Sequence, residues 1–108
     1  MSENQKPRHY RQGEILVHEI VGGIGSDHIK AYKVKKDRVI REGEVTGHLH
    51  KLDDNATLYE KDGTMFFRSN GSATLTHDEH ATIKFPKGDF RVEIQREYDE
   101  DGFSYIAD

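Results

Sequence analysis

The sequence predicts an all-β protein, a small antiparallel barrel or sandwich. Short runs of β-forming residues recur about every 8–12 residues, which is typical of such folds. Turn-forming pairs, Asp62-Gly63 and Asn70-Gly71, separate several of these runs and favour hairpins. No window of a dozen residues keeps a helical period of 3.6, so we expect no long helix.

Length and composition predict one domain with a thin core. The chain has 108 residues, of which 33% are hydrophobic. Residues 1–12 are polar and aperiodic, so we expect a mobile N-terminal arm there and a single β-barrel domain over residues 13–108. With no cysteine, the core cannot be reinforced by disulfides. We therefore expect either a metal ion or a homo-oligomeric interface to reinforce the core instead.

The first predicted strand covers residues 14–20, where adjacent Ile15, Leu16 and Val17 leave the buried face undecided. Residues 21–26 form a glycine-rich loop, which is not a phosphate loop because no Gly-Lys-Ser/Thr follows. The remaining predicted strands cover residues 31–34, 38–41, 43–52, 57–60, 65–68, 72–76, 81–85, 90–98 and 103–106.

The charge and the hydropathy of the chain limit the kinds of binding partner that we expect. The net charge is −4, and basic and acidic residues are interspersed, which disfavours binding to duplex DNA through its phosphates. No apolar run approaches the roughly 20 residues that cross a membrane, and the polar start resembles no signal peptide. We therefore expect a cytoplasmic protein whose partner is a small-molecule substrate or RNA.

The strand over residues 43–52 carries the first half of a histidine cluster. Its even positions, including His48 and His50, share one face opposite Val45 and Leu49 if the strand is regular. Residues two apart on a strand lie about 6–7 Å apart at Cα. Both rings can then converge on one ion at the usual Zn–N distance of about 2.0–2.1 Å.

The second half of the cluster is His77 and His80. In a continuous strand these two would face opposite sides, unless the chain bends at residues 78–79. We prefer His80 as the third ligand because it shares a polar face with Thr82 and Lys84. His77 or a glutamate would complete a mononuclear site.

The donor types leave the metal open among divalent transition ions. Imidazoles with an optional carboxylate suit Zn, Fe, Mn, Ni or Cu. Glu44, Glu60 and Glu79 are candidates for the carboxylate ligand, or for a general base beside a metal-bound water. The sequence thus predicts a small metal-binding protein, and an enzyme of unknown substrate if the metal activates water.

The segment Gly47-His48-Leu49-His50, followed later by a strand and Pro86-Lys87-Gly88, resembles the two half-motifs of the cupin barrels. The resemblance covers about 45 residues and implies a jelly-roll metalloprotein with Glu60 as a candidate carboxylate.

The chain departs from the cupin pattern after its second half-motif. Phe90 and Arg91 stand where a cupin has its last histidine. The final ligand would therefore have to come from His77 or His80, and the resemblance implies an architecture rather than an activity.

A second hypothesis is a metal-independent phosphodiesterase acting on RNA. Histidines with a pKa near about 6.5 suit proton transfer at neutral pH. His48, His50 and His80 would supply the acid and base, and Lys51 and Arg91 the phosphate clamp.

A third hypothesis is a non-enzymatic β-barrel adaptor with its histidines on the surface. For His9, His18 and His28, which are spread over the arm, the first strand and a loop, we expect surface or packing roles.

Overall fold

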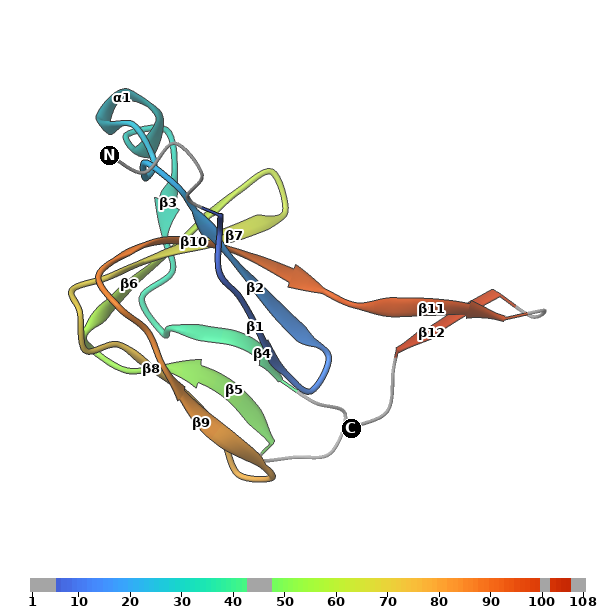
Figure 1. The fold of residues 1–108 in the computed structure, drawn as a ribbon. Helices are drawn as coiled ribbons and strands as arrows, with labels where there is room; N and C mark the ends of the chain where they lie inside the picture. Colours follow the sequence, from blue (N-terminus) through green and yellow to red (C-terminus); the bar gives the residue numbers. More distant parts are fainter. Residues whose placement is uncertain (1–5, 43–47, 100–101, 106–108) are drawn as a thin grey trace.

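Two antiparallel sheets and a two-stranded ribbon form the architecture of the computed structural model, which describes residues 6–42, 48–99 and 102–105 (Figure 1). The six-stranded sheet runs in the order β1 (His9–Gln12), β2 (Ile15–Ile20), β10 (Gly88–Ile94), β7 (Thr64–Ser69), β6 (Ala56–Lys61) and β3 (Lys33–Val34). The four-stranded sheet runs β4 (Val39–Glu42), β5 (Leu49–Leu52), β8 (Thr74–His77) and β9 (His80–Lys84). The ribbon pairs β11 (Arg96–Asp99) with β12 (Gly102–Tyr105) and extends away from both sheets.

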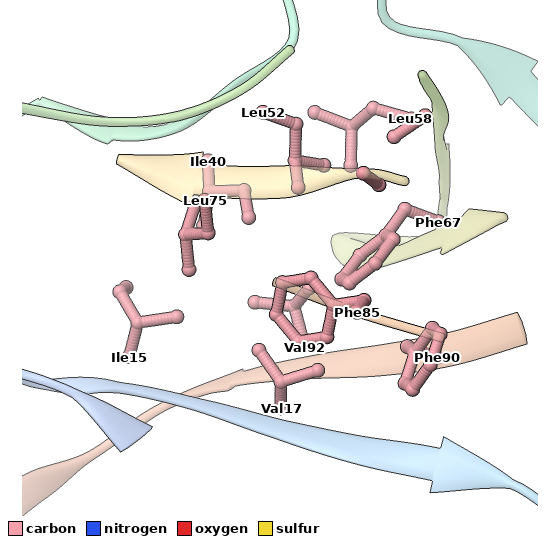
Figure 2. Packing of buried hydrophobic residues seen from close by; sticks show 12 residues of the cluster. Ile15, Val17, Ile40, Leu52, Leu58, Phe67, Leu75, Phe85, Phe90 and Val92 are labelled. Atoms are coloured by element: carbon pink, nitrogen blue, oxygen red, sulfur yellow. The ribbon is translucent and has the colours of Figure 1, made fainter. Parts of the chain in front are cut away.

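One hydrophobic core lies between the two sheets (Figure 2). The six-stranded sheet contributes residues such as Val17, Phe67 and Phe90, and the four-stranded sheet contributes Leu52 and Leu75, all at most 1% exposed. Because alternate residues of a strand face opposite sides, each sheet presents one apolar face to the other. The core is thus shared by strands far apart in the sequence.

The all-β prediction is confirmed. In the part of the chain that the structure describes, the only helix is α1 (Ser26–Ile29), a single turn. Within the same residues the two sheets share no ladder of paired strands, so they do not close into one barrel. No helix among these residues is long and apolar enough to cross a membrane.

The predicted boundary of the N-terminal arm is wrong. Residues 9–12, which we assigned to the arm, form β1 and pair with β2. Tyr10 packs its ring edge-on to Phe85 with centroids 4.9 Å apart, and Gln12 is 2% exposed. The sequence of β1 looks polar because only Tyr10 and Gln12 have inward-facing side chains, and Gln12 is itself polar. Residues 1–5 of the predicted arm lie outside the described residues.

Of the two predicted hairpin turns, one is confirmed. Lys61 pairs with Thr64 across Asp62-Gly63, and both turn residues have positive φ, +52° and +81°, as a type I′ turn requires. Asn70-Gly71 does not form a hairpin, because β7 and β8 belong to different sheets. Its segment is instead the connection that crosses from one sheet to the other.

The single strand predicted over residues 90–98 is two strands. β10 ends at Ile94, and the backbone N–H of Gln95 donates to the carbonyl of Glu14 at 2.8 Å. Beyond that point β11 pairs with β12 and leaves the six-stranded sheet. The alternating pattern continues through the break, so the sequence alone does not mark it.

The glycine-rich loop folds over the start of β10 and holds a buried carboxylate. Asp89, 5% exposed, accepts the backbone N–H of Ile24 at 2.7 Å and two N–H groups of Arg68 at 2.7 and 3.0 Å. A Cβ at Gly23, where φ is +76°, would lie 3.1 Å from the Asp89 carboxylate. Glycine there allows the close approach.

The Asp89 carboxyl has a lowered pKa. Its burial alone would raise the pKa, but the hydrogen bonds from Arg68 and Ile24 and the charge of Arg68 outweigh that effect. An unfolded aspartate titrates near about pH 3.9. The unfolded state therefore binds a proton first as the pH falls, and Asp89 stabilises the fold above that range.

We expect the Asp89 contribution to stability to be lost as the pH falls below about 4, through the pKa of the folded state. Asp89→Asn should cost about 1–3 kcal/mol of unfolding free energy at neutral pH, because it weakens charged hydrogen bonds. It should also make stability less dependent on pH in the acid range. Urea denaturation across pH measures both effects, with exposed Asp54→Asn as the control. An acid dependence equal to that of the unmodified protein would contradict the assignment.

Candidate metal site

His50 faces the core side of the four-stranded sheet, which corrects the predicted face. On β5, His50 and Leu52 are buried, whereas Lys51 is exposed. The prediction took Val45 and Leu49 as the inward positions, but the apolar side chain that fills the core here is Leu52. Residues 43–47, with Glu44, lie outside the described residues. His48 lies just before β5 and is half-buried.

The hairpin between β8 and β9 brings His77 and His80 to the same side. The two residues pair across a two-residue turn formed by Asp78 and Glu79. Residues that flank such a turn are opposite one another, and their side chains leave the same face of the hairpin. The bend that the sequence left open is therefore present, and both histidines join the cluster.

All four predicted histidines lie in one group of stacked rings. The ring centroids of His50 and His77 are 4.2 Å apart, and those of His77 and His80 are 4.8 Å apart. The His48 ring lies 5.9 Å from that of His77. His77 is thus the central ring of the group. Two of the four rings come from the segment around β5 and two from the β8–β9 hairpin.

Asp78, which was not among the predicted site residues, completes a set of three possible metal ligands. Its Oδ1 lies 2.9 Å from His48 Nδ1 and 3.6 Å from His77 Nδ1. The donor atoms of His48, His77 and Asp78 all lie within 4.8 Å of one another. The signal in the sequence was the acidic pair between two histidines, which we weighed only through Glu79.

The His48–Asp78 contact shifts both pKa values. The hydrogen bond to Asp78 raises the pKa of His48 despite some desolvation, and the same bond lowers the pKa of Asp78. Glu79 Oε1 lies 3.8 Å from the same His48 nitrogen. Two carboxylates, Asp78 and Glu79, therefore face the His48 imidazole and favour its cationic form.

The Nδ1 lone pair of His77 accepts a hydrogen bond from the turn that follows the residue. The backbone N–H of Glu79 donates to His77 Nδ1 at 3.1 Å. A neutral His77 then carries its proton on Nε2 and its lone pair on Nδ1, the atom nearest Asp78. Its side chain is only 5% exposed, so the ring is held in place.

The buried amide of Gln12 holds His50. Gln12 Nε2 donates to the carbonyls of Leu75 at 2.9 Å and Ala81 at 3.0 Å. Its Oε1 must therefore be the atom that accepts from His50 Nδ1 at 2.8 Å. The hydrogen bonds tie β1 to β8 and β9 and place the proton of His50 on Nδ1.

A partly buried ion pair lies on the other side of the same imidazole. Glu14 Oε1 is 3.8 Å from His50 Nε2, and Glu14 Oε2 accepts a hydrogen bond from Arg41 Nε. Gln12 and Glu14 come from the N-terminal segment and were not among the predicted site residues. No pattern in the sequence separates them from ordinary polar residues.

Two other predicted residues lie on the other sheet from the histidine group, and a third faces away from it on β5. Glu60 is on β6 and Arg91 is on β10, both in the six-stranded sheet. Arg91 is exposed between buried Phe90 and Val92, so it faces away from the core. Lys51 is exposed on β5.

The second half-motif of the cupin resemblance, residues 86–88, covers the end of the connection from β9 and the first residue of β10. Lys87 and Gly88 line a cleft of about 500 Å³ next to Arg68 and Asp89. None of the four histidines is in the lining of that cleft. The second half-motif therefore borders a cleft that these histidines do not line.

The fold and the cluster together define a two-sheet β protein with a partly buried group of histidines and carboxylates. Residues 11–95 match the model of a domain of unknown function, DUF8820, and the chain belongs to this family. The match includes all four clustered histidines and ends just before β11. No curated protein and no solved structure matches the chain.

Proposed function

We propose that this chain binds one divalent transition-metal ion through His48, His77 and Asp78. The observation that carries the proposal is that the three donor atoms lie within 4.8 Å of one another. They come from two separate segments, the residue just before β5 and the end of β8 with the turn that follows it. Two imidazoles and one carboxylate form a donor set suited to Zn and to non-haem Fe, with Mn, Ni and Cu as competitors.

Two of the three distances between the donor atoms are already close to those that an ion requires. Ligand atoms about 2.0–2.2 Å from one ion lie roughly 3–3.5 Å apart at tetrahedral or octahedral angles. Asp78 Oδ1 already lies 2.9 and 3.6 Å from the two imidazole nitrogens. Binding would displace the proton shared by His48 and Asp78, together with the turn hydrogen bond to His77 Nδ1.

His50 and His80 support this site by packing and are not needed as ligands. The His50 ring stacks on His77, and the Gln12 amide fixes its orientation. Groups behind the ligands that hold them in place commonly tune metal affinity. We assign His50 this orienting role.

The exposure of the site leaves room for further ligands. Asp78 is 54% and Glu79 64% exposed at the side chain, so water can reach the ion. Glu79 is the carboxylate placed to act as a fourth ligand or as a base toward a bound water. A metal-dependent reaction on a small molecule would take place here.

Cleavage of RNA without metal receives less support. Of its two proposed clamp residues, Arg91 lies on the outer face of the other sheet, and Lys51 is on the opposite face of β5 from His50. A clamp has to contact the phosphate that the acid and base act on. We therefore put metal binding first.

Replacement of a ligand should remove one metal equivalent per chain. Equilibrium dialysis against Zn²⁺ compares the unmodified protein with His48→Ala, His77→Ala and Asp78→Ala. We expect each variant to bind one equivalent less, with affinity at the site falling by more than the roughly 10–100-fold that loss of a supporting group costs.

The matched control is His28→Ala, an exposed histidine on α1. It should bind as much Zn²⁺ as the unmodified protein. Equal binding by His77→Ala, with its fold verified by circular dichroism, would rule out the proposed site.

A further inference from the structure

A second pair of imidazoles converges on the outer face of the six-stranded sheet. His9 on β1 and His18 on β2 are cross-strand partners, and their Nδ1 atoms are 2.8 Å apart. Neither residue belongs to the proposed metal site. Both were expected to have only surface or packing roles.

The register places these two side chains unusually close. The backbone N–H of Glu19 donates to the carbonyl of Arg8 at 2.8 Å, so Arg8 and Glu19 are a hydrogen-bonded pair. In an antiparallel ladder the next pair, His9 and His18, is then a non-hydrogen-bonded pair, whose Cα atoms approach to about 4.5 Å. Such pairs bring side chains closest together.

A carboxylate fixes which nitrogen of His18 is available. Glu93 Oε1 on the neighbouring strand β10 lies 2.7 Å from His18 Nε2. The carboxylate accepts the Nε2 proton, so a neutral His18 has its lone pair on Nδ1, directed at His9. A carboxylate hydrogen-bonded to the far nitrogen of a histidine is the usual support behind a histidine ligand.

We propose that His9 and His18 form a second divalent-metal site, which chelates an imidazole-preferring ion such as Ni²⁺, Cu²⁺ or Zn²⁺ through both Nδ1 atoms. His9 would carry its proton on Nε2, a change of tautomer that needs no net proton release. The two nitrogens have to separate by a few tenths of an ångström, and the rings have to turn so that both lone pairs point at the ion, for bonds of about 2.0–2.1 Å to form. Water completes the coordination, because His9 is exposed on an edge strand.

Two charged side chains near His9 and His18 affect how tightly this site would bind an ion. Glu93 offsets the charge of the ion, whereas Arg91, the register partner of His18 on β10, opposes it. With two protein ligands instead of three, this site should be weaker than the one at His48, His77 and Asp78. An ion there would also join the edge strand β1 to β2.

The test uses Ni²⁺ alone in isothermal titration calorimetry. The full chain carrying both His48→Ala and His77→Ala, which lacks the first proposed site, should still bind one Ni²⁺ per chain. Adding Glu93→Gln should weaken binding about 10–100-fold, and adding His9→Ala or His18→Ala should weaken it by more than that. Adding His28→Ala should change nothing.

Ni²⁺ affinity that is the same with and without His9→Ala and His18→Ala would overturn the second site. This result can be interpreted even if the first site binds no metal, because the variants that test the second site already lack the first. If the double-alanine background does not fold, Cu²⁺ is titrated into the unmodified protein up to two equivalents, so that the weaker second site is also filled, and amide NMR signals are followed during the second equivalent. Broadening at Tyr10 and Val17, which pair beside the two histidines, supports the site, and sharp signals there overturn it.

Discussion

Phe67→Ala should lower the free energy of unfolding by about 3–5 kcal/mol, the usual cost of removing a fully buried phenylalanine. Phe67 is 0% exposed, and its ring lies 4.9 Å from those of both Phe85 and Phe90. The substitution leaves a cavity between the two sheets, which the flanking strands cannot fill without losing register. A loss of this size is a large part of the roughly 5–15 kcal/mol that stabilises an ordinary domain.

Urea denaturation measures this loss as a lower midpoint with an unchanged slope. The control is Phe66→Ala, the same substitution one position earlier on β7. Phe66 faces the other side of the sheet, is only half-buried and contacts Tyr32, so we expect its loss to cost roughly 1–2 kcal/mol. Equal effects at the two positions would contradict the assigned core face.

Gln12→Leu should cost about 2–4 kcal/mol of unfolding free energy, although the side chains are similar in size. The substitution removes the donor to two carbonyls and the acceptor of the His50 N–H, in a place that is 2% exposed. Buried polar groups that lose a partner cost about 1–3 kcal/mol each. Carbonyls that keep another partner will lose less, which sets the total below the simple sum.

A mobile arm over residues 1–12 would predict no effect of Gln12→Leu, so the measurement separates the two interpretations. The neighbouring change Arg11→Ala is the control, because Arg11 is exposed on the same strand. It should alter stability by no more than about 0.5 kcal/mol. Gln12→Leu should also weaken Zn²⁺ binding, since His50 packs on the proposed ligand His77.

Much of the fold could be predicted from the sequence because strand signals are local. The glycine and aspartate at 62–63 specify one tight turn whatever surrounds them, and β6 and β7 meet there as expected. The pairing of β1 with β2 could not be predicted in this way. A strand of four residues with only Tyr10 and Gln12 turned inward has too little pattern to stand out from a polar terminus.

The candidate site, too, could be predicted from the sequence only in part. Residue types and spacing were sufficient to select His48, His50, His77 and His80, and the structure places all four rings together. Which atoms converge depends on how the β8–β9 turn is built and on which face of β5 is buried, and both follow from strand register. Register is set by contacts between distant strands.

By itself, therefore, the sequence determined the all-β class, most strand positions and the histidines that cluster. Only the tertiary structure decided that Asp78 joins His48 and His77, that Gln12 orients His50, and that His9 meets His18. The physical reason is that side-chain chemistry and turn preference are properties of neighbouring residues. The meeting of donor atoms instead requires strands from opposite ends of the chain to pack around one core.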